Sequence, residues 1–164
     1  MSFLQDSAEF KTDAGTLVFR VRRRFREEGV TEFDVSCDLE AKFASYLPKS
    51  FIGTFYRGDL SRFANYLEGN CGFFALKEEA VCSFPKVLIP SPRPFLTHGL
   101  EFTVRAMGGD IYSWSEGELN ILFLINCGPS IEGAANSYFG FQSCMALVDL
   151  REFCDSIRKV ENEE

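Results

Sequence analysis

Between Leu17 and Glu40 the chain alternates between apolar and charged side chains. Apolar residues alternate with charged ones on both sides of Gly29, at Leu17, Phe19, Val21 and Phe25, where only Arg23 breaks the apolar face, and then at Phe33, Val35, Cys37 and Leu39. A two-residue period places successive side chains on opposite faces, which is the pattern of a half-buried strand. We therefore expect an antiparallel hairpin whose apolar face belongs to the core.

The charged face of this hairpin is basic on its first strand and acidic on its second. If Phe25 faces Phe33, arginines and acids lie directly opposite one another, in the pairs Arg26–Glu32, Arg24–Asp34 and Arg20–Asp38. Opposite charges across a strand pair contribute about 0.2–1 kcal/mol each. We interpret these six residues as a structural charge ladder in preference to a phosphate or RNA site; in this register Arg23 has no acidic partner.

Two segments have helical periodicity. Each begins with an aspartate and continues with apolar residues at positions i, i+3, i+4 and i+7, namely Leu60, Phe63, Ala64 and Leu67 after Asp59, and Leu150, Phe153, Cys154 and Ile157 after Asp149. This spacing predicts helices at about 59–68 and 149–159, each with one apolar face packed on a sheet. The two segments start ninety positions apart. Their likeness is compatible with an old duplication and with coincidence.

The rest of the chain is rich in strand patterns, at 50–56, 99–107, 118–127 and 138–148, with a second hairpin expected at 73–84 and a turn at 108–110. We therefore expect an α+β fold, with about seven to nine strands in predominantly antiparallel, twisted sheets and two helices packed on them. A chain of 164 residues with 46% hydrophobic residues suits one globular domain. We expect this domain to span residues 1–160, with a frayed acidic tail at 161–164.

The charge balance of 17 Lys and Arg against 24 Asp and Glu argues against a nucleic-acid partner, which favours basic proteins. Residues 1–6 do not resemble a signal peptide, and the longest apolar stretch, Leu119–Cys127, is far shorter than the roughly 20 residues of a membrane-spanning helix. We expect a cytoplasmic protein without a membrane partner. Its cysteines lack CxxC spacing and His98 is the one histidine, so we expect reduced thiols, no metal site and no cofactor.

The segment from Ala106 to Leu150 contains no Lys or Arg but several acids. Acidic surfaces steer basic partners, and exposed aromatic side chains often anchor protein interfaces. The acids and aromatic residues of one short stretch combine both properties. They form the candidate partner-binding site: Asp110, Tyr112, Trp114, Glu116 and Glu118. The expected function is non-catalytic binding of a basic protein.

Two alternatives use other properties of the same sequence. Glu116 and Glu118 are two positions apart, so on a strand they would share a face as paired carboxylates for a metal-dependent enzyme. The aromatic content of 15% could line a small-molecule pocket, although such residues more often form core. A homo-oligomer is also compatible with the apolar content, although no exposed stripe locates an interface.

The order of the predicted elements resembles that of a known group of proteins. After the first hairpin, an aromatic strand leads into Gly58-Asp59-Leu60-Ser61-Arg62-Phe63, and the chain closes with a strand at Ser143–Val148 and the helix of Asp149-Leu150-x-x-Phe153. This order resembles the small acidic bacterial proteins grouped with WapI-type toxin-immunity proteins, over most of the chain. The resemblance implies a binding protein that neutralises a partner toxin without catalysis, and the acidic surface described above would make that partner basic.

Overall fold

The computed structural model describes residues 7–77, 79–80, 84, 94–97, 101–129 and 136–162. Within them the fold is α+β, as predicted, with eight antiparallel strands in two four-stranded sheets. The first sheet and its helices are β1 (Ser7–Thr12), β2 (Gly15–Phe25), β3 (Val30–Leu39), α1 (Ala41–Ala44), β4 (Ser50–Tyr56) and α2 (Asp59–Phe74). The second sheet and its helix are β5 (Phe95–Leu96), β6 (Phe102–Ser113), β7 (Glu116–Pro129), β8 (Asn136–Ala146) and α4 (Leu147–Asn162).

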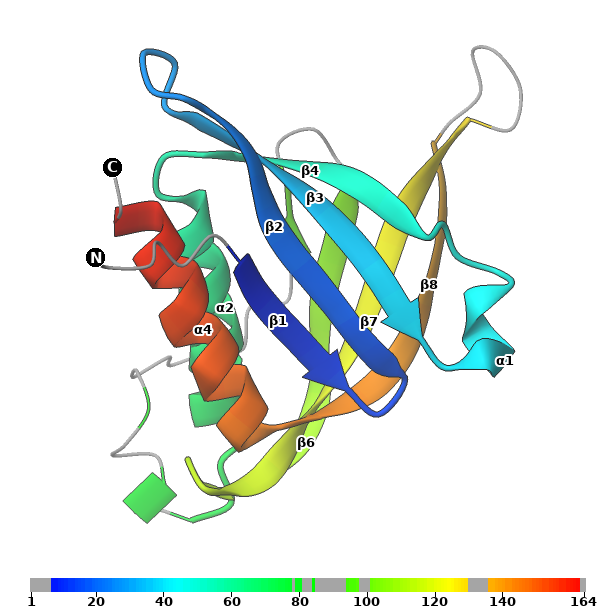
Figure 1. The fold of residues 1–164 in the computed structure, drawn as a ribbon. Helices are drawn as coiled ribbons and strands as arrows, with labels where there is room; N and C mark the ends of the chain where they lie inside the picture. Colours follow the sequence, from blue (N-terminus) through cyan, green and yellow to red (C-terminus); the bar gives the residue numbers. More distant parts are fainter. Residues whose placement is uncertain are drawn as a thin grey trace.

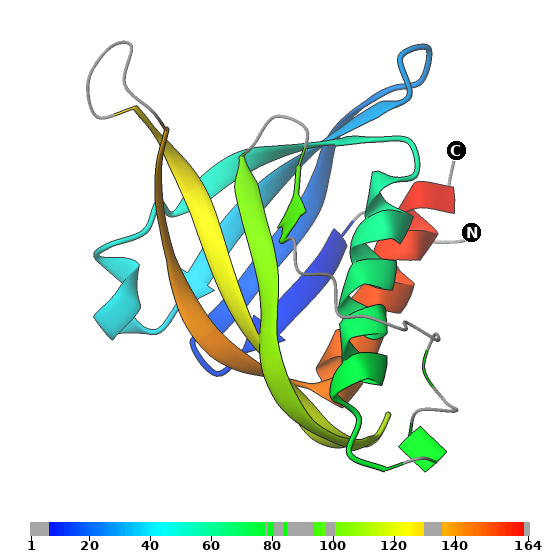
Figure 2. The same cartoon turned by 180° about the vertical axis from the view of Figure 1, so that it is seen from behind.

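Both sheets are simple meanders, in the orders β1-β2-β3-β4 and β5-β6-β7-β8. They face each other with their strands crossing, and α2 and α4 lie side by side along one side of the pair (Figures 1 and 2). A long helix follows the last strand of each sheet, α2 after β4 and α4 after β8. In the described part of the chain, each sheet is thus followed by one long helix, and the first sheet also has the short α1 between β3 and β4. We call a sheet together with the long helix that follows it one unit.

The two long helices contact each other through residues ninety positions apart. The rings of Phe63 and Phe153 lie 5.6 Å apart in an edge-to-face arrangement. The Cys154 thiol lies 3.8 Å from the carbonyl oxygen of Ala64, also ninety positions away. Residues at equivalent positions of α2 and α4 thus contact each other, as equivalent residues of two copies do across a twofold axis.

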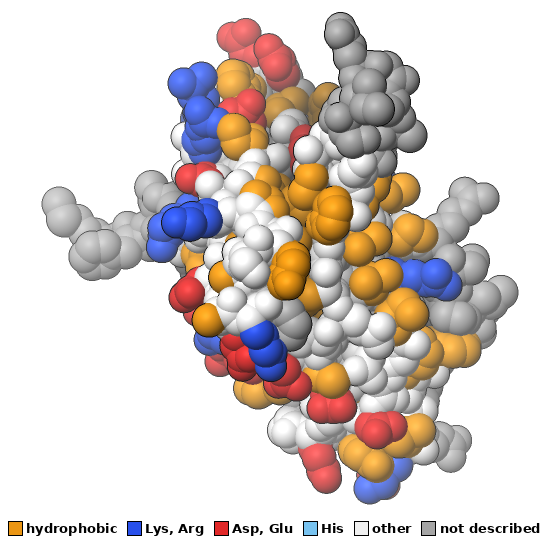
Figure 3. Space-filling model, turned by 90° about the vertical axis from the view of Figure 1, so that its right-hand side faces the viewer, with side chains coloured by type: hydrophobic (Ala, Val, Ile, Leu, Met, Phe, Trp, Pro, Cys, Tyr) orange, Lys and Arg blue, Asp and Glu red, His pale blue; other side chains and the backbone are white. Residues whose placement is uncertain are grey.

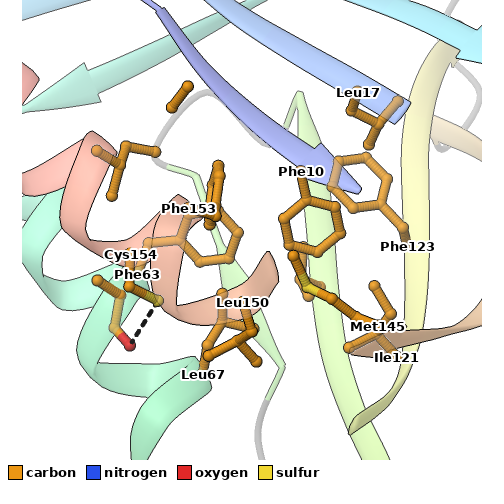
Figure 4. Close-up of a cluster of buried hydrophobic side chains, with 14 of the residues drawn as sticks. Phe10, Leu17, Phe63, Leu67, Ile121, Phe123, Met145, Leu150, Phe153 and Cys154 are labelled. Atoms are coloured by element: carbon orange, nitrogen blue, oxygen red, sulfur yellow. Dashed lines mark hydrogen bonds between the residues drawn. The ribbon is translucent and has the colours of Figure 1, made fainter. Parts of the chain in front are cut away.

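The core lies between the sheets and under the two helices, and both units contribute to it (Figure 4). The ring of Phe10 in β1 lies 5.8 Å from that of Phe123 in β7 and 5.0 Å from that of Phe153 in α4. Phe102 in β6 stacks 5.1 Å from Phe123. Burying one such side chain stabilises a fold by about 1.5–3 kcal/mol. The strands β1 and β4 add others to this core, such as Phe10 and Phe55. From β2 and β3 the alternation correctly identifies five of the buried core residues: Leu17, Phe19, Phe33, Val35 and Leu39.

The register of the first hairpin differs from the predicted one. Arg20 lies opposite Asp34 instead of Asp38, and Thr16 takes the place opposite Asp38. The turn between the two strands is shorter than in the predicted register. Phe25 pairs with Val30, so the turn contains only residues 26–29. A β-bulge between Val21 and Arg23 absorbs one further residue.

The bulge also changes the partners of the remaining ladder residues. Arg23, expected to lack an acidic partner, lies opposite Glu32, and Arg24 lies opposite Thr31. The Arg24 side chain donates to the carbonyl oxygen of Val160 at 2.8 Å. No ion pair joins β2 to β3 in the described part of the chain. The predicted pairs Arg26–Glu32, Arg24–Asp34 and Arg20–Asp38 are therefore wrong.

Three local expectations also change. Phe73 and Phe74 end α2, so the hairpin expected from residue 73 does not start there, although residues 78, 81–83 and 85–93 lie outside the described part. Residues 108–110 belong to β6 instead of forming a turn. The helix α4 continues to Asn162, so the acidic segment from 161 is not frayed at its start. Glu161 accepts hydrogen bonds from the backbone N–H groups of Gly58 (2.8 Å) and Ser61 (3.1 Å).

The described helices include none that is both long and apolar enough to cross a membrane. Five cysteines fall in the described residues, and all five are free thiols. Cys71 and Cys154 are buried, whereas Cys127 is exposed.

Candidate functional site

The candidate site lies at the end of the hairpin formed by β6 and β7. Ser113 pairs with Glu116, and the Ser113 and Ser115 side chains lie 3.1 Å apart in the connection between them. The close approach of the two strands requires Gly117, where φ is +132° and a Cβ atom would lie 2.4 Å from the carbonyl oxygen of Asp110. A glycine at this position lets the two strands meet without a clash.

Asp110 and Glu118 face each other directly across this hairpin. Both are exposed, and the buried neighbours Ile111 and Leu119 show that the carboxylates lie on the outer face of the sheet. Two like charges placed directly opposite each other destabilise a strand pair. Together with the exposed Glu116 they make this end of the sheet strongly acidic.

The charge of Glu118 also acts on the neighbouring strand. The pKa of the Cys144 thiol in β8 is raised, first by burial and then by the negative charge of Glu118. The Cys144 Sγ atom donates to the Oδ1 atom of Asn120 at 2.8 Å. Glu118 therefore lies close enough to β8 for its negative charge to act on Cys144.

The two aromatic residues of the candidate site differ in their surroundings. Tyr112 remains 37% exposed. Trp114 is half-buried, with its ring 4.1 Å from that of Phe84. The guanidinium carbon of Arg151, in α4, lies 5.8 Å from the Trp114 ring centre. The hairpin end thus presents Asp110, Tyr112, Glu116 and Glu118 to solvent, whereas Trp114 packs against residues of other segments.

Sequence reasoning missed two cations that border this site. The Lys77 ammonium lies 5.3 Å from the Tyr112 ring centre, and Arg151 covers Trp114. Lys77 comes close because the chain after α2 docks on β6, where the N–H of Leu76 donates to the carbonyl of Ile111 at 2.8 Å. No local pattern signals this contact, since the partners are separated by more than thirty positions.

Among the described residues, no three Asp, Glu, His or Cys side chains converge as metal ligands. A hollow of about 260 Å³ lies away from the acidic hairpin end, between the end of β3, α1 and the segment before β4. It includes Cys37, whose pKa burial raises to about 11. A thiol with so high a pKa is a weak nucleophile near neutral pH.

This chain matches no protein-family model, no curated protein and no solved structure. The resemblance to WapI-type immunity proteins therefore stays a prediction.

Proposed function

We propose that this protein is a non-catalytic protein-binding module that recognises a basic partner through the acidic end of the β6–β7 hairpin. The observation that carries the proposal is the pair of exposed carboxylates of Asp110 and Glu118, which face each other directly across two strands. This arrangement costs stability in the free protein. A cationic partner relieves this repulsion, so the free energy that the repulsion costs in the free protein is recovered on binding.

The surroundings of the pair suit a protein partner. Glu116 adds a third exposed negative charge at the hairpin end, and Tyr112 offers a partly exposed ring. Opposite potentials accelerate encounter, while an aromatic side chain contributes contact area. The narrower form of the proposal is an immunity-type protein that neutralises a basic toxin.

The experiment uses the purified chain as bait in an extract of its own cells. We expect one stoichiometric basic partner, whose binding weakens with rising salt. The double variant Glu116→Lys/Glu118→Lys should lose this partner. The matched control, Asp34→Lys/Asp38→Lys, reverses two exposed acids of β3 on the other sheet and should retain it.

Unchanged capture and salt dependence in the Glu116→Lys/Glu118→Lys variant would contradict the proposal. A thermal-shift titration with divalent cations runs in parallel, because a ligand that binds only the native state raises its stability. A cation-dependent stabilisation that disappears in the same double variant would favour the metal-dependent alternative.

A further inference from the structure

The aromatic ring of the acidic hairpin end already contacts a cation of the chain itself. The Lys77 ammonium lies over the Tyr112 ring, 5.3 Å from its centre, and such a cation is attracted by the negative face of the ring. Lys77 forms no ion pair within the described residues, although three exposed carboxylates belong to the same hairpin end, those of Asp110, Glu116 and Glu118. The contact of Lys77 is therefore with the ring, and the three carboxylates receive no cation from the described part of the chain.

Two features of the backbone bring Lys77 and Tyr112 together. The segment after α2 runs along β6, where Ala75 forms an isolated parallel bridge with Ile111 and the N–H of Leu76 donates to the Ile111 carbonyl at 2.8 Å. Lys77 is the next residue of this segment, and Tyr112 is the next residue of β6. The register of β6 shifts directly after Ile111, so Tyr112 lies at a β-bulge, where a strand redirects its side chains. The contact therefore follows from the way in which these two segments are paired.

Another cation can replace Lys77 over this ring. Tyr112 is 37% exposed and Lys77 is also exposed, and between exposed groups a cation–π contact changes an equilibrium only about two- to fivefold. Arginine is the stronger competitor, because its planar guanidinium group is more weakly hydrated than an ammonium group and stacks on aromatic rings. Figure 3 shows acidic side chains towards the lower end of the molecule, where Figure 1 places the end of the β6–β7 hairpin, with hydrophobic and basic side chains beside them.

We infer that Lys77 occupies the place of a partner's arginine in the free protein, and that the partner displaces Lys77 when it stacks this arginine on Tyr112. The inference rests on the proposed function, because it concerns the same hairpin end. The carboxylates attract any cation, whereas the ring of Tyr112 favours arginine over lysine. Lys77 lowers the affinity for the partner, since only the fraction of molecules with an open ring can bind in this way.

Isothermal titration calorimetry with the peptide hexa-arginine, at low salt, tests this inference. The matched control is Lys49→Met, which removes an exposed lysine directly before β4 and so changes the net charge by the same amount as Lys77→Met. Lys77→Met should bind the peptide about two- to fivefold more tightly than Lys49→Met does, because the competing cation is gone. Hexa-lysine should bind the wild type more weakly than hexa-arginine, and Tyr112→Leu should narrow this difference.

The variant Tyr112→Leu also separates the ring contact from the loss of charge. In this background Lys77→Met should bind hexa-arginine no more tightly than Lys49→Met, because the ring for which the cations compete is absent. An advantage of Lys77→Met that persists without the ring overturns the inference. Equal binding by Lys77→Met and Lys49→Met in the chain that retains Tyr112 overturns it as well.

The same titration distinguishes failure of the inference from failure of the proposed function. If the wild type binds hexa-arginine and Glu116→Lys/Glu118→Lys does not, the proposed function stands whatever the effect of Lys77→Met. A wild type that binds the peptide no better than this double variant contradicts the proposed function, and the inference with it.

Proton NMR of the wild-type chain follows the displacement without any variant. The Lys77 ammonium lies over the Tyr112 ring, so the ring current should shield the protons of the adjacent methylene group. Their signals should lie upfield of those of the exposed Lys49 and should move towards them as hexa-arginine binds. Signals that stay upfield at saturation overturn the inference, because the peptide then binds while Lys77 remains over the ring.

Discussion

At the scale of single residues, the most consequential contact joins Glu68 of α2 to Arg158 of α4. Glu68 is only 7% exposed, yet it carries a charge. Two nitrogens of Arg158 donate to its two carboxylate oxygens, one of them at 2.8 Å, and one of these nitrogens also reaches Asn65. Bidentate pairing of this kind compensates the loss of hydration of a buried carboxylate.

Replacing Arg158 by methionine should destabilise the protein by about 3 kcal/mol, because the Glu68 carboxylate would stay buried without its partner. The double variant Glu68→Leu/Arg158→Met should recover most of this loss. Urea unfolding of Arg158→Met, of Glu68→Leu and of the double variant measures the coupling energy between the two side chains. A free energy of unfolding of Arg158→Met within about 0.5 kcal/mol of wild type would contradict the prediction.

The buried thiol of Cys71 should make the protein less stable at alkaline pH. Its pKa is raised from 9.0 to about 12, first by burial and then by the charge of Glu68. The unfolded chain therefore releases this proton at lower pH than the folded chain, so the free energy of unfolding falls as pH rises above 9.0 towards 12.

The variant Cys71→Ala should show a weaker decline of stability with pH over this range. Cys127→Ala, which removes an exposed thiol, should keep the wild-type slope. Urea unfolding at several alkaline pH values gives the comparison. Equal slopes for all three proteins would show that the Cys71 thiol does not contribute.

At the scale of elements, the hairpin of β2 and β3 shows which structural features a local sequence pattern can predict. The alternation of Leu17, Phe19, Phe33 and Val35 correctly predicts the buried face, because a two-residue period is a property of the strand itself. The register depends on the turn and on the bulge beside Arg22, which the alternation does not specify. The charge pairs deduced from the register were therefore wrong, while the faces were right.

Glycines in the two edge strands β4 and β8 should respond very differently to substitution. A Cβ atom at Gly140 would lie 1.8 Å from the carbonyl oxygen of Phe123, whereas at Gly53 the nearest atom is 3.4 Å away, in the Phe55 side chain. Gly140→Ala should cost about 3 kcal/mol or more, and Gly53→Ala less than about 1 kcal/mol. Urea unfolding tests both, and similar losses would argue against the close approach of β7 and β8.

At the scale of the whole molecule, the two units share one aromatic core. Phe102 of the second unit lies within 6 Å, ring centre to ring centre, of Phe19, Phe55 and Phe63 of the first, at 5.9, 5.7 and 5.9 Å. Neither sheet therefore has a separate core, and the units should not unfold independently.

Thermal unfolding should accordingly be a single transition. Far-UV circular dichroism, which reports both units, and the fluorescence of Trp114, which reports the second, should give coincident curves. Phe102→Ala should lower the free energy of unfolding by about 3–5 kcal/mol and keep the curves coincident. Tyr46→Ala, at a 76% exposed position, should have little effect. Two separated transitions would show independent units.

The candidate site could be predicted only in part. Asp110, Tyr112, Glu116 and Glu118 are exposed at one hairpin end, a placement consistent with their short separation in the sequence. The packing of Trp114 could not be predicted, because Phe84 and Arg151 reach it from distant parts of the chain. The direct opposition of Asp110 and Glu118 required the register of β6 and β7, which contains two irregularities.

The sequence alone determined the α+β class, the apolar faces of β2 and β3, and the apolar faces of the two helices. These follow from periodicities of two and 3.6 residues, which each segment carries within itself. Tertiary structure decided the hairpin register, the meeting of α2 with α4 at positions ninety apart, and the cations over Tyr112 and Trp114. Those features depend on contacts between distant segments, whose relative placement is set by how the whole core packs.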